Sequence, residues 1–368
     1  MDPAELTPFH PLPEDTDALT SRVWEWGPQG EGAYARHVRL LPDGRVAGNL
    51  STNESGWRLR GGSMTFLDQF DISSATFERA FTDAEGRWVL LAPTHAPGGR
   101  PHTLREVAPV GGLAVAGEGM DPAWRGEAPR RRNLVVLRAN EQSLHTGWPR
   151  TIPAEDRTWD LCLSWYGARR DAPPDDWSEG WVQQPALRKY PAIHQLLHEA
   201  SPLWAYDYVA FPDDDLMITW RDWNQMFAVC REHRLDLAQP GLSPLGHVTH
   251  PITARDVRYV LRYTSFVESM TPAFSRAALR LCAPTFEKAV AGFGLDNVWP
   301  KLIGGAGVRN RIAIVDDIQA IHTRPVGVAY DLQAAIAEGN DLQWRYDAPS
   351  AVLEYGGVLK KPIDSQMV

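Results

Sequence analysis

The sequence predicts an α/β protein in which a mixed-sheet α/β domain follows a small, mostly antiparallel β domain. Between residues 37 and 116, short segments of alternating polarity are separated by turn residues such as Pro42-Asp43-Gly44, which is the pattern of antiparallel strands. After residue 125, apolar runs alternate with amphipathic helical segments, which indicates a sheet covered by helices. The predicted domains are therefore residues 1–125, including an N-terminal extension, and residues 126–368.

Composition limits the classes of function. With 43% hydrophobic residues among 368, the chain has enough apolar side chains for two cores. Its formal net charge of −9 argues against a nucleic-acid partner, because phosphate binding requires a basic surface. The three cysteines lack CxxC spacing, which favours free thiols in a reducing compartment. No apolar run is long enough to span a bilayer, and the acidic, proline-rich N-terminus is unlike a signal peptide, so we expect a cytoplasmic protein without a transmembrane segment.

The N-terminal half carries no legible chemical motif. Residues 1–30 are rich in proline and acidic residues and are expected to form a loosely draped lead-in. In the β domain, aromatic side chains such as Trp57 could bind a glycan or pack against the second domain. Gly117–Arg132 has the composition of a linker, and its run Arg130-Arg131-Arg132 is expected to be a solvated part of it.

The second domain begins with apolar segments of strand length. Leu134–Leu137 and Trp159–Trp165 suit central strands that are buried on both faces. Apolar residues at helical spacing then predict a helix over Tyr190–Ala200 and another after Thr219, with Cys230 on its apolar face. The pattern further predicts a loop over Leu237–His250, a broken helix over Ser275–Ala291 and a strand over Ile312–Val315 that leads to His322.

The segment Trp204–Asp215 is the stretch around which the second domain is organised. It is apolar, as a buried strand is, and it ends in three consecutive aspartates, Asp213, Asp214 and Asp215. Ligands of open α/β sheets bind beyond the carboxyl ends of the strands, and clustered carboxylates there suit Mg²⁺ or Mn²⁺. The alternative is a solvated acidic turn before a helix, because Thr219 and Asp222 have the spacing of a capping box.

Six stretches of the second domain carry a resemblance to a known family. They are Leu134–Trp148, Trp159–Gly167, Tyr206–Leu216, Phe266–Phe274, Gly292–Pro300 and Ala313–Gly327. Together they resemble domain-of-unknown-function family 707, which is itself similar to glycosyltransferases of the GT-A fold. The resemblance covers about residues 130–330 and implies a GT-A-like, Rossmann-like mixed sheet. It also implies transfer of a sugar from a nucleotide-sugar donor to a glycan or other small hydroxyl acceptor.

The resemblance implies roles for particular residues. Asp213, Asp214 and Asp215 fall at the place of the family's DxD motif, which holds a Mn²⁺ or Mg²⁺ ion and the donor diphosphate. The resemblance implies that Asp213 and Asp215 bind the metal and that Asp213 and Asp214 contact the donor. His322 matches a further metal ligand, although a lone histidine is more often structural. A cation there would counter the negative charge that grows on the leaving diphosphate.

Further positions are expected to contact substrate. Inversion requires a carboxylate that deprotonates the acceptor hydroxyl, and Asp296 falls where related inverting enzymes carry an acidic residue. A helix N-cap is the alternative role for Asp296. Asn140, Ser143 and Tyr166 follow the first two strands, where a GT-A fold receives the nucleotide. Glu268 is expected either to bind sugar hydroxyls or to form a structural pair.

We therefore expect a metal-dependent glycosyltransferase, with inversion weakly preferred. One alternative is a haloacid-dehalogenase-like phosphohydrolase, in which Asp213 is the nucleophile, Asp215 the acid, and Asp316 and Asp317 hold Mg²⁺. Another is a protein that binds nucleotide-sugars or glycans without catalysis.

Overall fold

The structure is a computed structural model of the 368-residue chain. It describes residues 6–361, except residues 10, 11, 13, 50, 94–99, 109–118, 185–186, 305–309 and 326–330. The chain divides into two compact units. The first contains residues 1–111, 298–308 and 343–349, and the second contains residues 112–297, 309–342 and 350–368.

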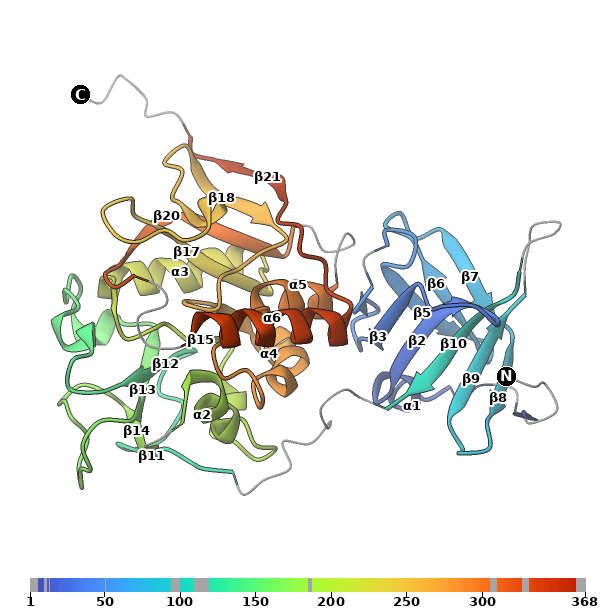
Figure 1. Cartoon of the computed structure of the whole chain (residues 1–368), viewed down its shortest axis with the longest axis horizontal. Coiled ribbons are helices and arrows are strands. Elements are labelled where there is room, and N and C mark those ends of the chain that lie inside the picture. Colours follow the sequence, from blue (N-terminus) through green and yellow to red (C-terminus); the bar gives the residue numbers. More distant parts are fainter. Residues whose placement is uncertain are drawn as a thin grey trace. The chain divides into compact units, whose positions relative to one another are not determined.

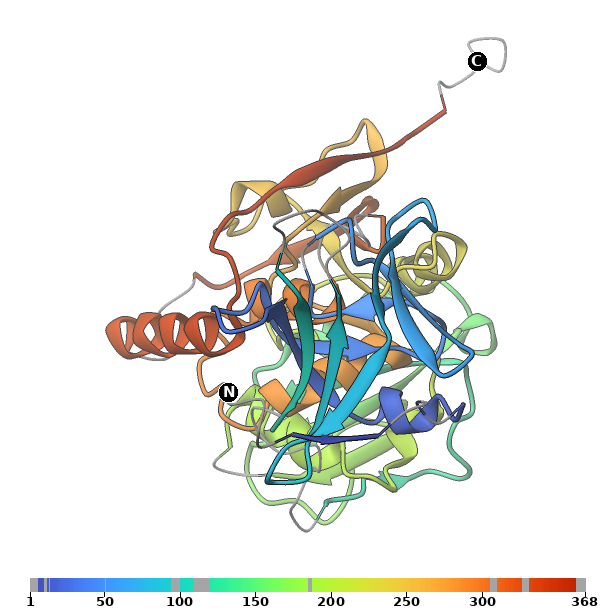
Figure 2. The same ribbon diagram turned by 90° about the vertical axis from the view of Figure 1, so that its right-hand side faces the viewer.

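The first unit is built from antiparallel β-sheets. A seven-stranded sheet has the order β1-β8-β9-β10-β2-β3-β4, and a three-stranded sheet has the order β5-β6-β7. These strands lie side by side in Figure 2, coloured blue to cyan. Their bounds are Thr7–Pro8 (β1), Val23–Pro28 (β2), Ala35–Leu40 (β3), Val46–Ala47 (β4), Gly56–Arg60 (β5), Ser63–Leu67 (β6), Ser73–Phe77 (β7), Arg79–Thr82 (β8), Trp88–Ala92 (β9) and His102–Val107 (β10).

The N-terminal residues are part of this fold, so the predicted loose lead-in is wrong for most of residues 14–30. The short helix α1 (Asp17–Thr20) is followed by β2, which lies inside the seven-stranded sheet between β10 and β3. Trp24 and Trp26 of β2 are only 0% and 3% exposed and pack in the core of the unit. Burial of two indoles outweighs the local effect of proline and acidic residues.

The second unit holds a mixed sheet of eleven strands. Its order is β11-β14-β13-β12-β15-β19-β17-β20-β18-β21, with β16 paired to β20 beside this path (Figure 1). The pairs β12–β13, β13–β14, β12–β15 and β17–β20 are parallel, whereas β15–β19, β17–β19 and β18–β20 are antiparallel. The predicted α/β class, with a mixed sheet preceded by a small antiparallel β domain, is confirmed.

The strands of the mixed sheet are Ala123–Trp124 (β11), Asn133–Ala139 (β12), Trp159–Trp165 (β13), Gly180–Gln183 (β14), Tyr208–Ala210 (β15), Leu216–Met217 (β16), Leu237–Leu242 (β17), Tyr259–Thr264 (β18), Ala273–Ser275 (β19), Ile312–His322 (β20) and Glu354–Leu359 (β21). The α-helices after α1 are Lys189–Leu196 (α2), Trp220–Glu232 (α3), Arg276–Cys282 (α4), Leu295–Ile303 (α5) and Leu332–Tyr346 (α6). Residues 298–303 of α5 and 343–346 of α6 belong to the first unit. Helix α3 packs against β20, and the two are labelled in Figure 1.

Several elements form where the local pattern predicts them. All seven residues of β12 and of β13 are buried, as continuous apolar runs require. Helix α3 begins with a complete capping box, in which Thr219 accepts from the backbone of Asp222 and the Asp222 side chain accepts from the backbone of Thr219. Cys230 of α3 is fully buried in the core, as its helical spacing predicts.

Three elements differ from the prediction. Residues 237–242 were expected to form a loop but are the buried central strand β17, with a shift of register between Pro240 and Gly241. Proline lacks the N–H that a regular ladder needs, so the strand accommodates it at an irregularity. The strand expected over Trp204–Asp215 is regular only at Tyr208–Ala210, and the one expected to end at Val315 continues to His322.

The predicted solvated linker is also wrong in part. Arg131 is 16% exposed, and its Nη1 lies 2.9 Å from Oδ1 of Asp160 and 2.7 Å from Oε1 of Glu179. Residues 123–124 form β11, and residues 117–118 lie outside the described ranges. Arg131 therefore belongs to a buried ion-pair network, whereas Arg130 and Arg132 are exposed as expected.

Where the structure describes the chain, it contains no helix long and apolar enough to cross a membrane.

Candidate active site

Strand register brings the third aspartate and His322 together. Residues 211–213 continue from β15 toward the short strand β16, which pairs antiparallel with β20 so that Leu216 faces His322. Asp215 directly precedes β16, and its backbone oxygen accepts from the N–H and hydroxyl of Thr323 at 3.1 and 2.8 Å. Nε2 of His322 lies 3.4 Å from Oδ2 of Asp215. Two residues that are far apart in sequence are thus fixed by a backbone ladder.

The Asp215–His322 pair is buried and incompletely satisfied. Asp215 is 7% exposed and His322 is 6% exposed. Among the described residues, Oδ1 of Asp215 has no hydrogen-bond partner. Burial alone would lower the pKa of His322, but the nearby carboxylates, led by Asp215, raise it above its usual value of 6.5. A buried carboxylate oxygen without a partner is costly, so Asp215 is a candidate for binding a ligand.

The first aspartate has a cation of its own. Nζ of Lys189, at the start of α2, lies 2.6 Å from Oδ1 of Asp213 and donates to the backbone oxygens of Ser269 and Met270, both at 2.9 Å. The pKa of Asp213 is nonetheless raised, because its partial burial outweighs the effect of Lys189 and Asp215 adds repulsion. Lys189 was not predicted from the sequence, since no motif relates it to the aspartates.

The middle aspartate is held by three side chains. Oδ2 of Asp214 accepts from the hydroxyls of Ser143 and Tyr166, both at 2.9 Å, and Oδ1 lies 3.2 Å from Nη1 of Arg324. Burial and the neighbouring Asp214 raise the pKa of Tyr166, so its hydroxyl remains a donor at neutral pH. The structure thus brings Ser143 and Tyr166 to the acidic segment, where they support Asp214.

Asn140 organises the turn beneath this contact. Its side-chain oxygen accepts from the N–H of Gln142 at 2.8 Å, and its own N–H donates to the hydroxyl oxygen of Ser143 at 2.7 Å. Asn140 therefore contacts the aspartates only through Ser143, which it positions. Its predicted contact with the nucleotide stays a prediction.

Two further acids, Glu268 and Asp296, complete the cluster. Burial is the main cause that raises the pKa of Glu268 to about 8, with repulsion from Asp296 next, and burial raises the pKa of Asp296 to about 7. Oδ1 of Asp296 accepts from the N–H of Ser269. Among the described residues, Oε2 of Glu268 is buried without a partner. Asp296 is the second residue of α5, so it lies inside the helix rather than at its N-cap.

The predicted acids form one electrostatic neighbourhood. The pKa of His322 is raised by Asp215, Asp213 and Glu268, and the pKa of Glu268 is raised in turn by Asp296 and Asp213. These five residues come from four separate stretches of the chain, because Asp213 and Asp215 belong to the same run. The structure therefore brings these predicted residues near one another, and Lys189 and Arg324 lie beside the aspartates. The roles of all of them stay predictions.

The donor set fits a divalent cation in part. In the described portion of the chain, no group of three His, Cys, Asp or Glu side chains is close enough to hold a metal ion. Asp215 and His322 form a suitable pair of ligands, and the unpartnered oxygen of Asp215 is available to coordinate a cation. Asp213 is engaged by Lys189 and is not brought in as a third ligand. Mg²⁺ and Mn²⁺ commonly complete their shells with water and substrate phosphate, so two protein ligands suffice.

The carboxylates required by the phosphohydrolase alternative are engaged elsewhere. Asp316 is fully buried and makes a bidentate ion pair with Arg262, with N–O distances of 2.8 and 3.0 Å. Asp317 lies 2.9 Å from Nζ of Lys360. Each carboxylate thus has its own cation, and the structure gives the alternative no support.

Comparison with known proteins gives a limited result. No family model and no curated protein matches the chain. The solved structure of TarS from S. aureus with UDP-GlcNAc is similar, with 14% sequence identity and a TM-score of 0.37. The similarity covers 59% of this chain and 65% of the TarS chain, which is less than two thirds of the length of TarS. A second similar structure is that of glucosyl-3-phosphoglycerate synthase from Mycobacterium tuberculosis, in complex with Mn²⁺, UDP-glucose and phosphoglyceric acid. Its sequence identity is 16% and its TM-score is 0.35, and the similarity covers 63% of this chain and 89% of the synthase chain. Scores this low carry no argument about activity, and the resemblance to family 707 stays a prediction.

Proposed function

We propose that this protein is a glycosyltransferase that moves a sugar from a nucleotide-sugar donor to a glycan or other hydroxyl acceptor, with Mn²⁺ or Mg²⁺ as cofactor. The single observation that carries the proposal is the buried Asp215–His322 pair, with its unpartnered carboxylate oxygen, beside two acids of raised pKa. Buried acids with perturbed pKa values that converge on one place are characteristic of catalytic sites.

Asp215 and His322 would hold the cation. When bound there, a divalent cation counters the negative charge that develops on the leaving diphosphate. The burial of both side chains keeps bulk water from competing for them, and the β16–β20 ladder fixes their separation. The neutralisation of Asp213 by Lys189 limits the charge of the acidic segment, so that a diphosphate is not repelled by three free carboxylates.

Asp296 would act as the general base. A base works best when its pKa lies near the working pH, and burial raises the pKa of Asp296 to about 7. In its ionised form it accepts the proton of the acceptor hydroxyl as that oxygen attacks the anomeric carbon from the face opposite the leaving group, which inverts the configuration. The N–H of Ser269 donates to Oδ1 and fixes the carboxylate in place.

Ser143, Tyr166 and Arg324 would shape the donor side of the site. Their contacts hold Asp214 in one orientation, and Arg324 adds a half-exposed guanidinium near it. A cation of this kind suits the binding of phosphate. Glu268, with its pKa raised to about 8, is protonated at neutral pH and can donate a hydrogen bond to a sugar oxygen.

The test is release of nucleoside diphosphate from a panel of UDP-, GDP-, ADP- and dTDP-sugars by the purified chain, with Mn²⁺ present or removed by chelation. We expect cation-dependent turnover of at least one donor, and its loss in Asp215→Asn. Asp171→Asn, which alters an exposed aspartate outside the acidic segment, is the matched control. Turnover that survives in Asp215→Asn would overturn the assignment, and donor binding without turnover would favour the non-catalytic alternative.

A further inference from the structure

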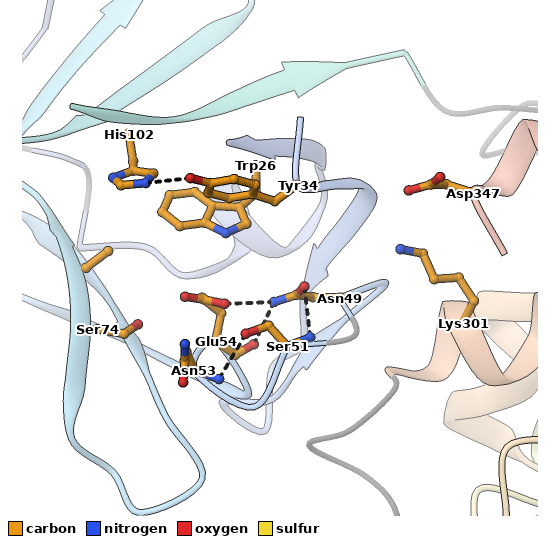
Figure 3. Close-up of a pocket in the computed structure, with 11 residues that line it drawn as sticks. Trp26, Tyr34, Asn49, Ser51, Asn53, Glu54, Ser74, His102, Lys301 and Asp347 are labelled. Atoms are coloured by element: carbon orange, nitrogen blue, oxygen red, sulfur yellow. Dashed lines mark hydrogen bonds between the residues drawn. The ribbon is translucent and has the colours of Figure 1, made fainter. Parts of the chain in front are cut away.

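The first unit contains a cavity of its own, separate from the acidic cluster of the second unit. Its volume is about 460 Å³, within the range of small-molecule sites. The lining is shown in Figure 3 and consists of Trp26, Tyr34, Asn49, Ser51, Asn53, Glu54, Ser74, Ala75, His102, Lys301 and Asp347, all of which belong to the first unit.

One wall of the cavity is aromatic. The ring of His102 stacks on the buried indole of Trp26, with centroids 5.1 Å apart and an interplanar angle of 26°. The ring of Tyr34 lies 5.7 Å from that of His102, and its hydroxyl is 3.4 Å from Nε2 of His102. Tyr34 is 61% exposed, an unusual position for a large aromatic side chain. The contact with His102 orients the ring of Tyr34, and its exposed face can contact an apolar surface.

The opposite wall is polar and comes from the segment between β4 and β5. In Figure 3, Glu54, Asn49, Ser51 and Asn53 lie across the cavity from the aromatic rings. Nδ2 of Asn49 donates to the backbone oxygen of Glu54 at 3.2 Å, and the hydroxyl of Ser51 accepts from the N–H of Asn53 at 3.1 Å. These contacts order the segment, so that its amide, hydroxyl and carboxylate groups are presented in fixed positions.

We propose that this cavity binds a saccharide. A pyranose ring has an apolar C–H face and hydroxyl groups around its edge, and a cavity with an aromatic wall facing amides, a hydroxyl and a carboxylate matches both. The charges of the lining disfavour an anionic ligand, because Glu54 and Asp347 outnumber Lys301. This inference goes beyond the transferase proposal and does not depend on it, because none of its residues belongs to the acidic cluster.

The test is saturation-transfer NMR on the full chain without nucleotide or metal. The probes are the methyl glycosides of glucose, galactose, mannose and N-acetylglucosamine and their β-linked disaccharides. We expect saturation of at least one probe. We expect Tyr34→Ala to weaken its affinity by about tenfold, because stacking on an aromatic ring is lost, and Tyr34→Phe to retain it. Glu54→Gln should weaken it as well, because a charged acceptor is replaced by a neutral amide.

Two controls make the outcome specific. Phe70→Ala removes another exposed aromatic ring of the same unit, one that does not line the cavity, and should leave binding unchanged. Asp215→Asn should also leave it unchanged, since it alters only the acidic cluster. No saturation of any probe would overturn the proposal, as would binding that persists in Tyr34→Ala or disappears in Asp215→Asn. These results are distinguishable from failure of the transferase proposal, because that proposal is tested with nucleotide-sugars and this one without nucleotide or metal.

Discussion

Nζ of Lys189 lies 2.6 Å from Oδ1 of Asp213, which gives the first of three consecutive aspartates its own counter-charge. The neighbouring Asp214 is held by hydroxyl groups and a guanidinium, and Asp215 faces His322. Three adjacent carboxylates therefore have three separate environments. Repulsion within the run is relieved side chain by side chain, and a single bridging ion is not needed to hold it together.

Lys189→Met should destabilise the protein and weaken donor binding. The substitution leaves Asp213 without its cation and removes one donor from each of the backbone oxygens of Ser269 and Met270, which keep the Tyr190 hydroxyl and the Asp213 N–H. We expect a loss of about 1–3 kcal/mol in the free energy of unfolding, because charge-assisted hydrogen bonds are lost. Urea denaturation at neutral pH measures it. Lys301→Met is the control for donor binding, because it removes a buried lysine that lies outside the acidic cluster. Equal donor binding in wild type and Lys189→Met would contradict a role for Lys189 in the site.

His322→Ala should abolish the response to divalent cation. Loss of a residue that merely supports a metal ligand costs roughly 10–100-fold in metal affinity, so loss of a direct ligand should cost at least about tenfold. The measurement is the rise in melting temperature on addition of Mn²⁺ with UDP, GDP or ADP in turn, because a ligand of the native state stabilises it. A variant that retains the full shift would show that the cation binds elsewhere.

Asp296 should give stability an unusual dependence on pH. Its pKa is raised from 3.8 to about 7, so between these values the folded protein keeps a proton that the unfolded chain has released. The free energy of unfolding contributed by this group must therefore fall as pH rises from about 4 to about 7, and level off above. Asp296→Asn should remove this contribution and gain stability relative to wild type across that window. Parallel pH profiles for the two proteins would contradict a raised pKa of Asp296.

The same group should set the pH profile of transfer. If Asp296 is the base, kcat/KM rises with pH through about 7 and then reaches a plateau, because only the ionised carboxylate accepts the acceptor proton. Asp296→Asn should lose turnover by about two to four orders of magnitude while donor affinity is retained. Steady-state kinetics from pH 5 to 9 and a donor titration separate the two effects. An unchanged rate in Asp296→Asn would remove Asp296 from the mechanism.

Tyr166→Phe should affect the donor side of the site without disturbing the fold. The phenyl ring preserves packing, whereas Asp214 loses a hydroxyl donor at 2.9 Å, so we expect about 1 kcal/mol in stability and a weaker donor complex. Tyr263→Phe, at a half-buried tyrosine of β18 outside the acidic cluster, is the matched control. Identical donor affinities for the two variants would show that the Tyr166 hydroxyl does not contribute.

The features that the sequence predicts well are those with local causes. The strand Trp159–Trp165 and the capping box of Thr219 and Asp222 depend on neighbouring residues, and both form as expected. The strand Leu237–Leu242 was missed because proline and glycine disfavour strands locally, while its burial between two partners overrides that preference.

In the candidate site, too, the sequence predicts what depends on neighbouring residues and misses what depends on contacts between distant ones. The three aspartates are legible in the sequence, but their environments are made by residues distant along the chain. Nothing in local spacing connects Lys189 to Asp213, and only the resemblance to a family pointed to His322 and Asp296. The pKa values that give Asp296 and Glu268 their chemical interest come from burial, which is a property of the folded chain.

The pairing of Leu216 with His322 has a consequence for how this protein can vary over evolution. Successive side chains of a strand point to opposite faces, so gain or loss of one residue between Asp215 and Met217 would turn Asp215 away from His322. Substitutions can accumulate at the surface of such a protein, whereas an insertion or deletion at this point would separate the two residues. Among relatives that keep the activity, we expect insertions and deletions to be absent from residues 215–217.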